Sequence, residues 1–388
     1  MDNYNKKILV TGGHLTPAVA VINELRSKGY NNFVWVGHKY NQAGSKISTA
    51  EFNTISDLNI PFHNLRTGKL IRDWSFSTFL YGIKNLIFVM LGLLGAIRII
   101  LKEKPNIVLS FGGYLALPIV ISASFMGIKV ITHEQTLVVG MANKIISKFA
   151  NKVLISWEGS IKYFKNKDKV RFTGNPIRSS VFEIKDDSLI KELDKSLPTI
   201  LIYGGNQGAH EINKRIFEIL KDLLKDFNVI HQTGNSNATK DNERSKHIYA
   251  SLENEYKNRY VPVEYINQEQ VGSVLNKADI IVGRSGANSI AEILALGKLC
   301  ILIPIPHTSH NEQITNAKFV EASGLGIYLE QDTLLPQKLY QNILILRNQL
   351  NANKSANNQN LDEVRNNSKK LIKLDAAELV AQEVIGLL

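Results

Sequence analysis

Short runs of aliphatic and β-branched residues alternate with helix-length segments along most of the chain. The runs at 7–10, 107–110 and 199–203 are four or five residues long, which suits buried strands. Strands separated by helices predict parallel sheets with both faces covered, because a parallel connection has to cross over the sheet. The alternation restarts after a charged, poorly patterned stretch at 183–195, so it predicts two doubly wound α/β halves. Further strands are expected at 33–36, 129–132, 152–155, 228–231, 280–282 and 300–303, and helices from Pro17 and over the long segment 75–103.

The chain is long enough for two domains. It has 388 residues, of which 44% are apolar and 21% charged. We expect an amino-terminal domain over 1–177 and a carboxy-terminal domain over 178–370, joined near 175–178. The polar stretch 351–370 is expected to be a surface segment or a loosely held helix. Residues 371–388 have helical apolar spacing, and we expect them to pack back onto the first domain.

The composition favours a cytoplasmic protein. Cys300 is the single cysteine, which excludes an internal disulfide and a zinc site built from cysteines. Such cysteine usage fits a reducing compartment. The first ten residues lack the long apolar core of a signal peptide.

Positive charge is concentrated in the first half. Residues 1–180 contain 23 Lys and Arg against 9 Asp and Glu, whereas residues 181–388 contain 23 against 26. This excess indicates either a solvated basic face or a surface that meets an anionic partner. Charge alone does not separate a membrane from a nucleic acid.

One segment favours the membrane. Residues 85–97 carry no charge and lie between Lys84 and Arg98, with aromatic residues and further cations on either side. Thirteen residues are too few to span a bilayer, which needs about 20. The alternative is that this segment is a buried helix of an α/β core. The two interpretations are compatible if one face of the helix is buried and the other is exposed to the membrane. We expect a peripheral protein that meets anionic lipid through the patch near 66–104.

Two glycine-containing loops follow predicted strands in the second half. Residues 204–209 (GGNQGA) follow the strand at 199–203, and residues 284–292 (RSGANSIAE) follow the strand at 280–282. Glycines let backbone amides approach an anion, and a helix amino terminus adds partial positive charge, so both loops suit a diphosphate. A carboxylate such as Glu292 can bond a ribose diol. The alternatives are a turn needed only for packing and a solvated helix residue.

Polar residues also follow strands in the first half. His14 lies on the first strand-to-helix loop, where a histidine suits general-base catalysis. His133, Glu134 and Gln135 follow the strand at 129–132. A lone histidine is more often structural, and that alternative stays open for His14.

No metal or other cofactor is expected. His307, His310 and Glu312 share one loop, but their spacing lacks the regularity of metal ligands. No D-x-D sequence occurs, which is the usual way of holding the metal of a sugar nucleotide.

Seven stretches together resemble the MurG family, the bacterial N-acetylglucosaminyltransferases that convert lipid I to lipid II in peptidoglycan synthesis. They are TGGHLTP at 11–17, SFGGY at 110–114, HEQ at 133–135, GNPIR at 174–178, GGNQGA at 204–209, GRSGANSIAE at 283–292 and QITNA at 313–317. Each is weak alone, but their shared order makes the resemblance specific. It implies a GT-B glycosyltransferase fold, with two Rossmann-like domains that face an interdomain cleft. The carboxy-terminal domain would bind UDP-N-acetylglucosamine (UDP-GlcNAc), and the amino-terminal domain the undecaprenyl-diphosphate acceptor.

The resemblance also implies functions for individual residues. His14 matches the family's proposed base, and Glu134 is the second catalytic candidate. Glu292 would hold the ribose, Ile266 the uracil through its backbone, and Gln313 the sugar. The other residues implied for the donor site are Thr11, Gly12, Gly13, Thr136, Arg178, Asn206, Ala287, Asn288 and Ser289. The candidates on the acceptor side are Gly112, Gly113 and Tyr114.

The chain departs from the family's pattern at three places. The first loop is typically GGTGGH, whereas this chain has VTGGH at 10–14 and so lacks two glycines of a loop thought to help hold the acceptor diphosphate. Thr136 stands where the family usually has Asn, and Asn206 where it usually has Ser. The shortened loop leaves a divergent acceptor open.

The expected reaction is inverting transfer of N-acetylglucosamine from UDP-GlcNAc to the C4 hydroxyl of muramoyl-pentapeptide-diphosphate-undecaprenol. It would take place at the cytoplasmic face of the plasma membrane and serve cell-wall synthesis, cell shape and cell division. The alternatives are a UDP-GlcNAc 2-epimerase, a glycolipid synthase that uses diacylglycerol, and a non-catalytic sugar-nucleotide binder. A nucleic-acid-binding protein is least expected, because the glycine loops would have no function in it.

Overall fold

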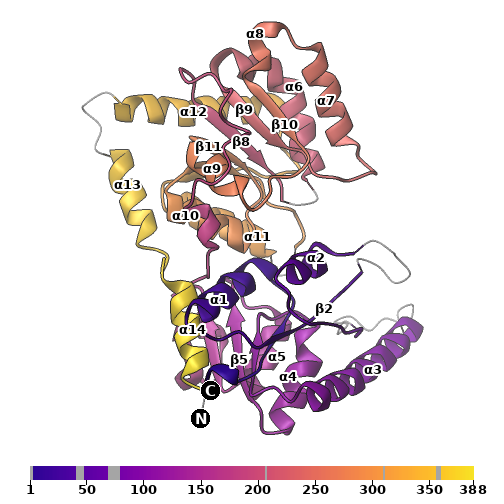
Figure 1. Cartoon of the computed structure of the whole chain (residues 1–388). Helices are drawn as coiled ribbons and strands as arrows, with labels where there is room; N and C mark the ends of the chain where they lie inside the picture. The colour runs from indigo at the N-terminus through magenta and orange to yellow at the C-terminus, as the bar shows by residue number, and fades with distance from the viewer. Residues whose placement is uncertain (1–2, 41–47, 69–78, 206–207, 309–310, 355–359) are drawn as a thin grey trace. The chain divides into compact units, whose positions relative to one another are not determined.

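The chain forms two compact units (Figure 1). The computed structural model describes all residues except 1–2, 41–47, 69–78, 206–207, 309–310 and 355–359. The first unit consists of Met1–Arg178 together with Lys373–Leu388, and the second of Ser179–Ile372. Each unit has its own parallel sheet.

The first unit is built on a seven-stranded sheet in the order β3-β2-β1-β4-β5-β6-β7. Its strands are β1 (Ile8–Thr11), β2 (Phe33–Gly37), β3 (Phe62–Asn64), β4 (Ile107–Ser110), β5 (Lys129–Glu134), β6 (Lys152–Ile155) and β7 (Val170–Phe172). Its helices are α1 (Leu15–Ser27), α2 (Ala50–Asp57), α3 (Phe79–Glu103), α4 (Ala116–Phe125), α5 (Met141–Phe149) and α14 (Ala376–Ile385). The winding direction changes between β1 and β4, and open α/β sheets bind ligands beyond the strand ends at such a switch point.

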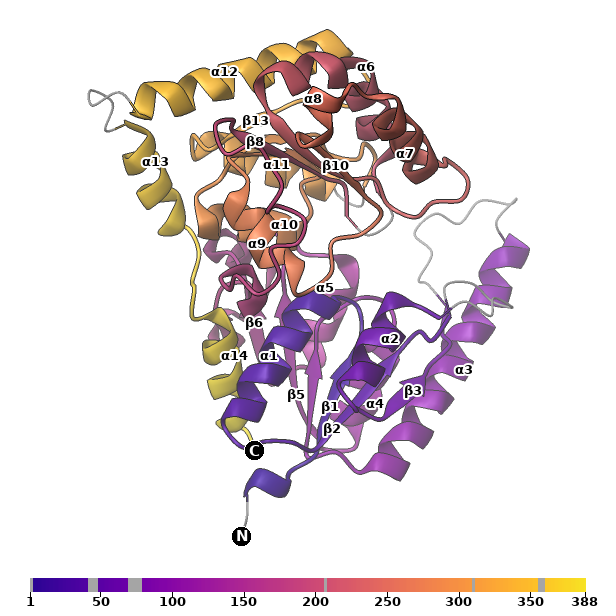
Figure 2. The ribbon, with the colours of Figure 1, turned by 45° about the horizontal axis from the view of Figure 1, so that its top comes forward.

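Helices cover both faces of this sheet, as Figures 1 and 2 show. Successive side chains of a strand point to opposite faces. Ile8 and Val10 pack in one core with residues of α1 and α14, whereas Leu9 packs in another with residues of α3, α4 and α5. Every residue of β1 and β4 is buried. Burial on both faces explains why these strands are continuous apolar runs, and the predicted doubly wound class is confirmed.

The helix α14 packs beside α1 in the first unit (Figure 1). Val380 and Val384 are fully buried in the same core as Leu25 of α1. The ion pair between Lys152 and Glu383, at 2.5 Å, ties α14 to the start of β6. A segment from the end of the sequence therefore completes a core that the first 178 residues begin.

The second unit is built on a six-stranded parallel sheet in the order β10-β9-β8-β11-β12-β13. Its strands are β8 (Thr199–Tyr203), β9 (Asn228–Gln232), β10 (Tyr260–Val263), β11 (Ile280–Gly283), β12 (Leu299–Leu302) and β13 (Gly326–Tyr328). Its helices are α6 (His210–Asp226), α7 (Asp241–Ser251), α8 (Asn254–Lys257), α9 (Gln270–Lys277), α10 (Ala287–Leu296), α11 (Glu312–Ala322), α12 (Pro336–Lys354) and α13 (Asn360–Lys369). The switch point lies between β8 and β11.

Several elements have different ends from those predicted. The helix α1 begins at Leu15 rather than at Pro17, because His14 has extended backbone and a first turn accommodates proline. The helix α3 covers most of the predicted segment 75–103, and residues 75–78 lie outside the described residues. The polar stretch 351–370 contains the end of α12 and the helix α13.

The long helix α3 has one buried and one exposed side. Ala96 and Ile100 lie in the core. Among the described side chains of α3, the large apolar ones that are exposed are Ile87, Phe88, Met90, Leu91, Leu94 and Leu101. Phe125, at the end of the neighbouring helix α4, is also exposed. Within the described part of the chain, no helix combines the length and apolar character needed to cross a membrane.

Candidate active site

Two glycine loops of the first unit meet at the switch point between β1 and β4. Gly13 follows β1 with φ of +142°, and Gly112 and Gly113 follow β4 with φ of +79° and +81°. A Cβ atom on Gly13 would lie 2.5 Å from the carbonyl oxygen of Gly112, so only glycine fits where the two backbones touch. The structure thus brings Gly12 and Gly13 next to the acceptor-side candidates Gly112, Gly113 and Tyr114.

Thr11 and His14 lie on either side of the first loop. Thr11 ends β1 and is buried, and its Oγ1 has no hydrogen-bond partner among the described residues. His14 precedes α1 and keeps part of its surface exposed. The surrounding protein nevertheless removes enough water to lower the pKa of His14 to about 4. The imidazole is therefore neutral near pH 7 and able to accept a proton.

Glu134 ends β5, and hydrogen bonds hold its carboxylate, whereas the buried Oε1 of the neighbouring Gln135 has no partner among the described residues. The buried carboxylate of Glu134 accepts hydrogen bonds from Thr136 N (3.0 Å), Thr136 Oγ1 (2.7 Å), Gly140 N (3.3 Å) and Asn143 Nδ2 (2.9 Å). Burial raises the pKa of Glu134, although these donors oppose the shift. The contacts hold the loop after β5 in place, and Thr136 is engaged in them. A catalytic function of Glu134 stays a prediction.

A cavity of about 350 Å³ lies beside the first glycine loop. Its described lining consists of Gly12, Gly13, Leu15, His38, Glu51, Gly113, Tyr114 and Leu115. Sequence reasoning missed His38, which follows β2, and Glu51, which lies in the first turn of α2. Neither belongs to a stretch that carries the family resemblance. Both residues come close to the first glycine loop because β2 pairs with β1 in the parallel sheet, and no motif in the sequence marks that pairing.

The glycine loop after β8 is fixed by close backbone contacts in the second unit. Gly205 and Gly208 have φ of +81° and +77°. A Cβ atom on Gly208 would overlap the carbonyl oxygen of Thr233, whereas one on Gly205 would meet no atom of the described residues within 4 Å. The side chain of Gln232 donates from Nε2 to Gly205 O at 2.8 Å. Asn206, a predicted donor contact, lies outside the described residues.

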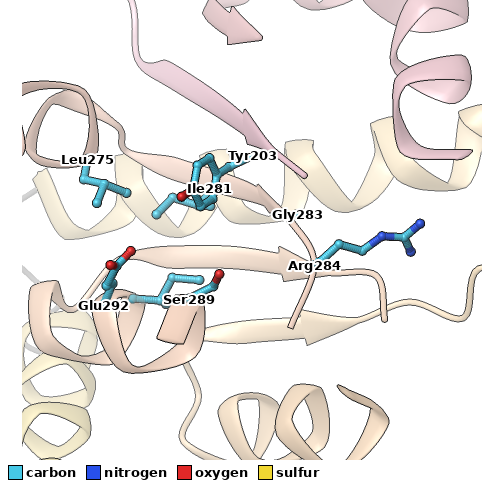
Figure 3. A pocket seen from close by; sticks show the side chains of 8 residues that line it. Tyr203, Leu275, Ile281, Gly283, Arg284, Ser289 and Glu292 are labelled. Carbon is cyan, nitrogen blue, oxygen red and sulfur yellow. The ribbon is translucent and has the colours of Figure 1, made fainter. Parts of the chain in front are cut away.

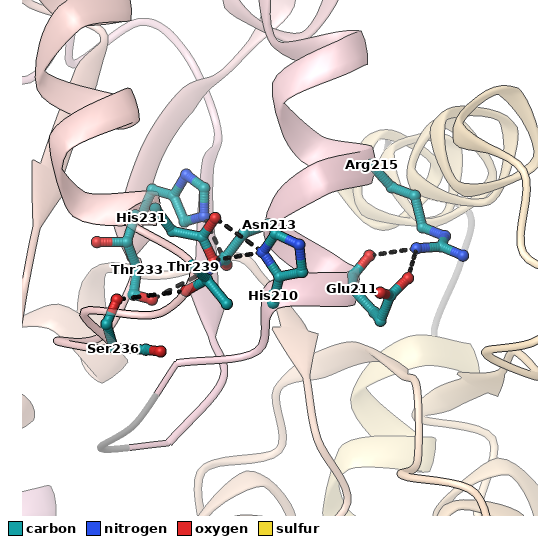
Figure 4. A network of polar contacts seen from close by, with 9 residues as sticks. His210, Glu211, Asn213, Arg215, His231, Thr233, Ser236 and Thr239 are labelled. Atoms are coloured by element: carbon teal, nitrogen blue, oxygen red, sulfur yellow. Dashed lines mark hydrogen bonds and ion pairs between the residues drawn. The ribbon is translucent and has the colours of Figure 1, made fainter.

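A polar network joins this loop region to α6 and α7 (Figure 4). Asn213 Nδ2 donates to Thr233 O at 3.0 Å and to the buried carboxylate of Asp241 at 2.9 Å. His210 Nδ1 also bonds that carboxylate at 2.9 Å. His231 Nε2 bonds Asn213 Oδ1 at 3.0 Å, and burial lowers the pKa of His231 to about 3. The network fixes α6, whose amino terminus follows the glycine loop.

The loop after β11 is tied to the helix α11. Ser285 Oγ donates to Gln313 O at 2.7 Å, and Asn316 Nδ2 donates to Ser285 O at 2.9 Å. The side-chain oxygen of Gln313 accepts from Ile305 N at 3.0 Å. The first turn of α10 contains three predicted donor residues, Ala287, Asn288 and Ser289. These contacts place the predicted residues of both segments in one region of the second unit.

Glu292 lies farther along α10 and is 4% exposed. It lines a small cavity with Tyr203, Arg284 and Ser289 (Figure 3). The cavity holds about 10 Å³, which is room for about one water molecule. This cavity is too small for a ribose. Burial lowers the pKa of Arg284 to about 10, so its guanidinium stays charged at neutral pH.

Two predicted donor residues have other surroundings. The backbone N–H of Ile266 donates to Gln232 Oε1 at 3.2 Å, so a uracil that binds this amide would have to displace Gln232. Sequence reasoning missed Gln232, which carries no motif of its own. Arg178 is half-buried, and in the sequence it is the last residue of the first unit before the second unit begins.

The described residues do not form a metal site. Among them, no three His, Cys, Asp or Glu side chains come close enough together to hold an ion. His307 follows β12 and Glu312 begins α11, whereas His310 lies outside the described residues. A reaction without a metal stays a prediction.

Family models match both units. Residues 11–155 match the glycosyltransferase family 28 N-terminal domain, and residues 199–380 match the C-terminal domain of that family. A relative from Clostridium tetani (strain Massachusetts / E88) is 36% identical over 337 residues, which are 85% of this chain and 86% of that protein. Its name is UDP-N-acetylglucosamine--N-acetylmuramyl-(pentapeptide) pyrophosphoryl-undecaprenol N-acetylglucosamine transferase. This chain belongs to the MurG family.

Membership of the MurG family makes the chain a glycosyltransferase with the GT-B fold, as predicted. The crystal structure of Acinetobacter baumannii MurG matches with a TM-score of 0.67 and 24% identity over 99% of this chain and 100% of that one. The UDP-GlcNAc 2-epimerase from Neisseria meningitidis matches with a TM-score of 0.65 and 14% identity over 98% and 100%. At these identities both structures show a shared fold alone.

Proposed function

We propose that this chain transfers N-acetylglucosamine from UDP-GlcNAc to the C4 hydroxyl of a muramoyl-pentapeptide linked through a diphosphate to undecaprenol. The Clostridium tetani relative is named for this transferase reaction, and it matches 85% of the chain. The structural observation that carries the proposal is the pair of glycine loops after β8 and β11, next to the buried carboxylate of Glu292.

Two helix amino termini of the second unit support the binding of a nucleotide diphosphate. The helix α6 begins at His210 and α10 begins at Ala287, each directly after one of the loops. Because β8 and β11 are neighbouring parallel strands, both helix amino termini lie at the carboxyl ends of the strands, on the same side of the sheet. Each contributes a partial positive charge of about half a unit, which favours phosphate. Glu292 would accept hydrogen bonds from the ribose, and no obligatory metal is part of the proposal.

In the transfer, the bond between sugar C1 and the diphosphate oxygen breaks, and a bond between C1 and the acceptor oxygen forms. The imidazole of His14 takes the hydroxyl proton, since its pKa of about 4 keeps it neutral beforehand. The negative charge of a nearby diphosphate would raise this pKa and strengthen the base. General-base catalysis of this kind contributes about 10²–10⁴-fold. The helix amino termini stabilise the departing UDP.

The exposed face of α3 supports a peripheral location at the membrane. Ile87, Leu91 and Leu94 are exposed there, and so are Arg98 and Lys102 on the same helix. Apolar side chains among cations suit a surface that dips into lipid headgroups while the cations meet anionic lipid. The proposed position is the cytoplasmic face of the plasma membrane, where the reaction would serve cell-wall synthesis, cell shape and cell division.

A radiolabelled-donor assay tests the reaction. Full-length protein should transfer label to a water-soluble lipid I analogue and not to diacylglycerol. The His14→Ala variant should lose about two decades or more of turnover with UDP affinity nearly intact. His247→Ala, which replaces an exposed histidine of α7, should keep wild-type turnover. Transfer to diacylglycerol would indicate a glycolipid synthase, and release of UDP with 2-acetamidoglucal would indicate an epimerase. Full activity of His14→Ala would exclude His14 as the general base.

A vesicle-sedimentation assay tests the membrane surface. Vesicles that contain phosphatidylglycerol should bind the full-length protein, and Leu94→Glu should weaken that binding. Leu335→Glu is the matched control, because Leu335 is 66% exposed, like Leu94 at 61%, but lies in the second unit. Equal binding by both variants would contradict the role of α3.

A further inference from the structure

The cavity beside the first glycine loop has a carboxylate in its wall. We call it the Glu51 cavity, defined by the eight lining residues given above. The Glu51 side chain lies against the backbones of Gly12 and Gly37, where a Cβ atom on either glycine would overlap its carboxylate. Two glycines therefore make room for Glu51 at the end of β1 and of β2. The family resemblance implies that this first loop helps to hold the acceptor diphosphate.

Two backbone amides near the Glu51 cavity are used within the protein. Gly12 N donates to Val36 O at 2.7 Å, and Gly112 N donates to Ser110 Oγ at 3.1 Å. None of the eight described lining residues is a lysine or an arginine. A phosphate in this cavity would meet the negative charge of Glu51, and no lysine or arginine of the described lining would offset the repulsion.

Glu51 retains the capacity to accept further hydrogen bonds. Its Oε1 accepts from Trp35 Nε1 at 2.8 Å, and its Oε2 accepts from His38 N at 3.3 Å. Each carboxylate oxygen has two lone pairs, so one further bond per oxygen is available. These donors fix the carboxylate, while burial raises the pKa of Glu51. A fixed, half-buried acceptor suits an O–H or N–H group of a ligand.

Two further polar side chains of the lining are also held in place. His38 Nε2 and the Tyr114 hydroxyl are hydrogen-bonded at 2.8 Å, which joins the end of β2 to the loop after β4. Leu15 and Leu115 supply apolar lining. A volume of about 350 Å³, mostly apolar walls and a few fixed polar groups are typical of a small-molecule site.

We infer that the Glu51 cavity binds an uncharged hydrogen-bond donor of the acceptor, a hydroxyl or amide N–H of its muramoyl-peptide portion, rather than its diphosphate. This inference rests on the proposed function, which supplies the acceptor. The inference also relates to the shortened first loop. In this chain Glu51 would contact the acceptor, whereas a longer glycine loop would present backbone amides to the acceptor phosphate.

Competition by two halves of the acceptor tests the inference in the full-length protein. Muramoyl pentapeptide carries the uncharged donors, and citronellyl diphosphate carries the diphosphate. Glu51→Gln should weaken inhibition by muramoyl pentapeptide about tenfold or more, because hydrogen bonds to a charged group are among the stronger ones. Inhibition by citronellyl diphosphate and the KM for UDP-GlcNAc should change less than about twofold.

Asp57→Asn is the matched control. It removes the same charge from the same helix α2, but at an exposed side chain outside the cavity lining. It should leave both inhibition constants unchanged. If Glu51→Gln alters inhibition by citronellyl diphosphate instead, or alters neither, the inference is overturned. If the wild type does not transfer label at all, the proposed function fails first.

Hydrogen exchange gives a second measurement that needs no variant. In the wild type, muramoyl pentapeptide should slow exchange of the backbone amides at 12–15 and 48–52. Citronellyl diphosphate should not. Protection by citronellyl diphosphate alone would place the diphosphate in the cavity and overturn the inference, even if Glu51→Gln did not fold.

Discussion

The variant Gly208→Ala tests how closely the glycine loop after β8 approaches Thr233, which follows the neighbouring strand β9. Gly205 and Gly208 lie on one loop with nearly the same φ, +81° and +77°. An alanine at either position pays about 1–2 kcal/mol for left-handed backbone. Among the atoms that the structure describes, the added methyl group overlaps another one at Gly208 alone, the carbonyl oxygen of Thr233. Overpacking of this kind costs about 1–3 kcal/mol more.

These energies predict a measurable difference in melting temperature. For a domain of this size, 1 kcal/mol shifts Tm by about 2–4 °C. Gly205→Ala should therefore lower the Tm of the second unit by about 2–8 °C, and Gly208→Ala by about 2–12 °C beyond that. Gly208→Ala should also raise the KM for UDP-GlcNAc more than Gly205→Ala does, since it displaces the backbone of the loop.

Two optical signals separate the units. The three tryptophans stand at positions 35, 74 and 157, all before the second unit begins, so their fluorescence follows the first unit. Circular dichroism follows both. Gly208→Ala should shift the dichroism transition and leave the fluorescence transition in place. Equal Tm losses for the two variants would refute the argument from close approach.

Two further predictions concern buried polar groups of the first and second units. Burial lowers the pKa of His133 to about 4 and that of His231 to about 3, whereas both titrate near 6.5 when unfolded. Between these pKa values and pH 6.5 the unfolded chain binds more protons than the folded chain. The free energy of unfolding should therefore decrease as the pH is lowered below about 6.5, by roughly 2 kcal/mol per histidine between pH 7 and pH 5. Urea denaturation at the two pH values measures this, and equal midpoints would contradict it. Glu134→Gln should cost the first unit about 1–3 kcal/mol, because an amide hydrogen then faces the donors that the carboxylate accepts. Tryptophan fluorescence in urea reports that loss, and an unchanged midpoint with reduced kcat would favour a catalytic role for Glu134.

The sequence predicted the fold well because two simple patterns determine it. Buried parallel strands are short apolar runs, and glycines mark the turns that follow β1, β4, β8 and β11. The strand ends flanking each switch point were therefore visible as motifs. Family resemblance added the substrate class, which no periodicity contains.

The contacts around these motifs were not predictable in the same way. His38 and Glu51 come from the connection between β2 and α2, where no spacing rule marks them, and only the sheet order brings them to the first glycine loop. Gln232 is a strand residue by pattern, yet it holds both Gly205 and the amide of Ile266. Long-range packing decides such contacts, and a single sequence records it weakly.

The return of α14 to the first unit has a consequence for biosynthesis. Domains generally fold as they leave the ribosome, in order from the amino terminus. Here the whole of Ser179–Ile372 is translated before α14 appears, a delay of roughly 10–40 s at 5–20 residues per second. During that interval the apolar side of α1 that Val380 and Val384 later cover is exposed in the nascent chain. The helix α14 thus covers the core of the first unit only after the second unit has been translated. The apolar surface of α1 is therefore accessible to chaperones throughout that interval.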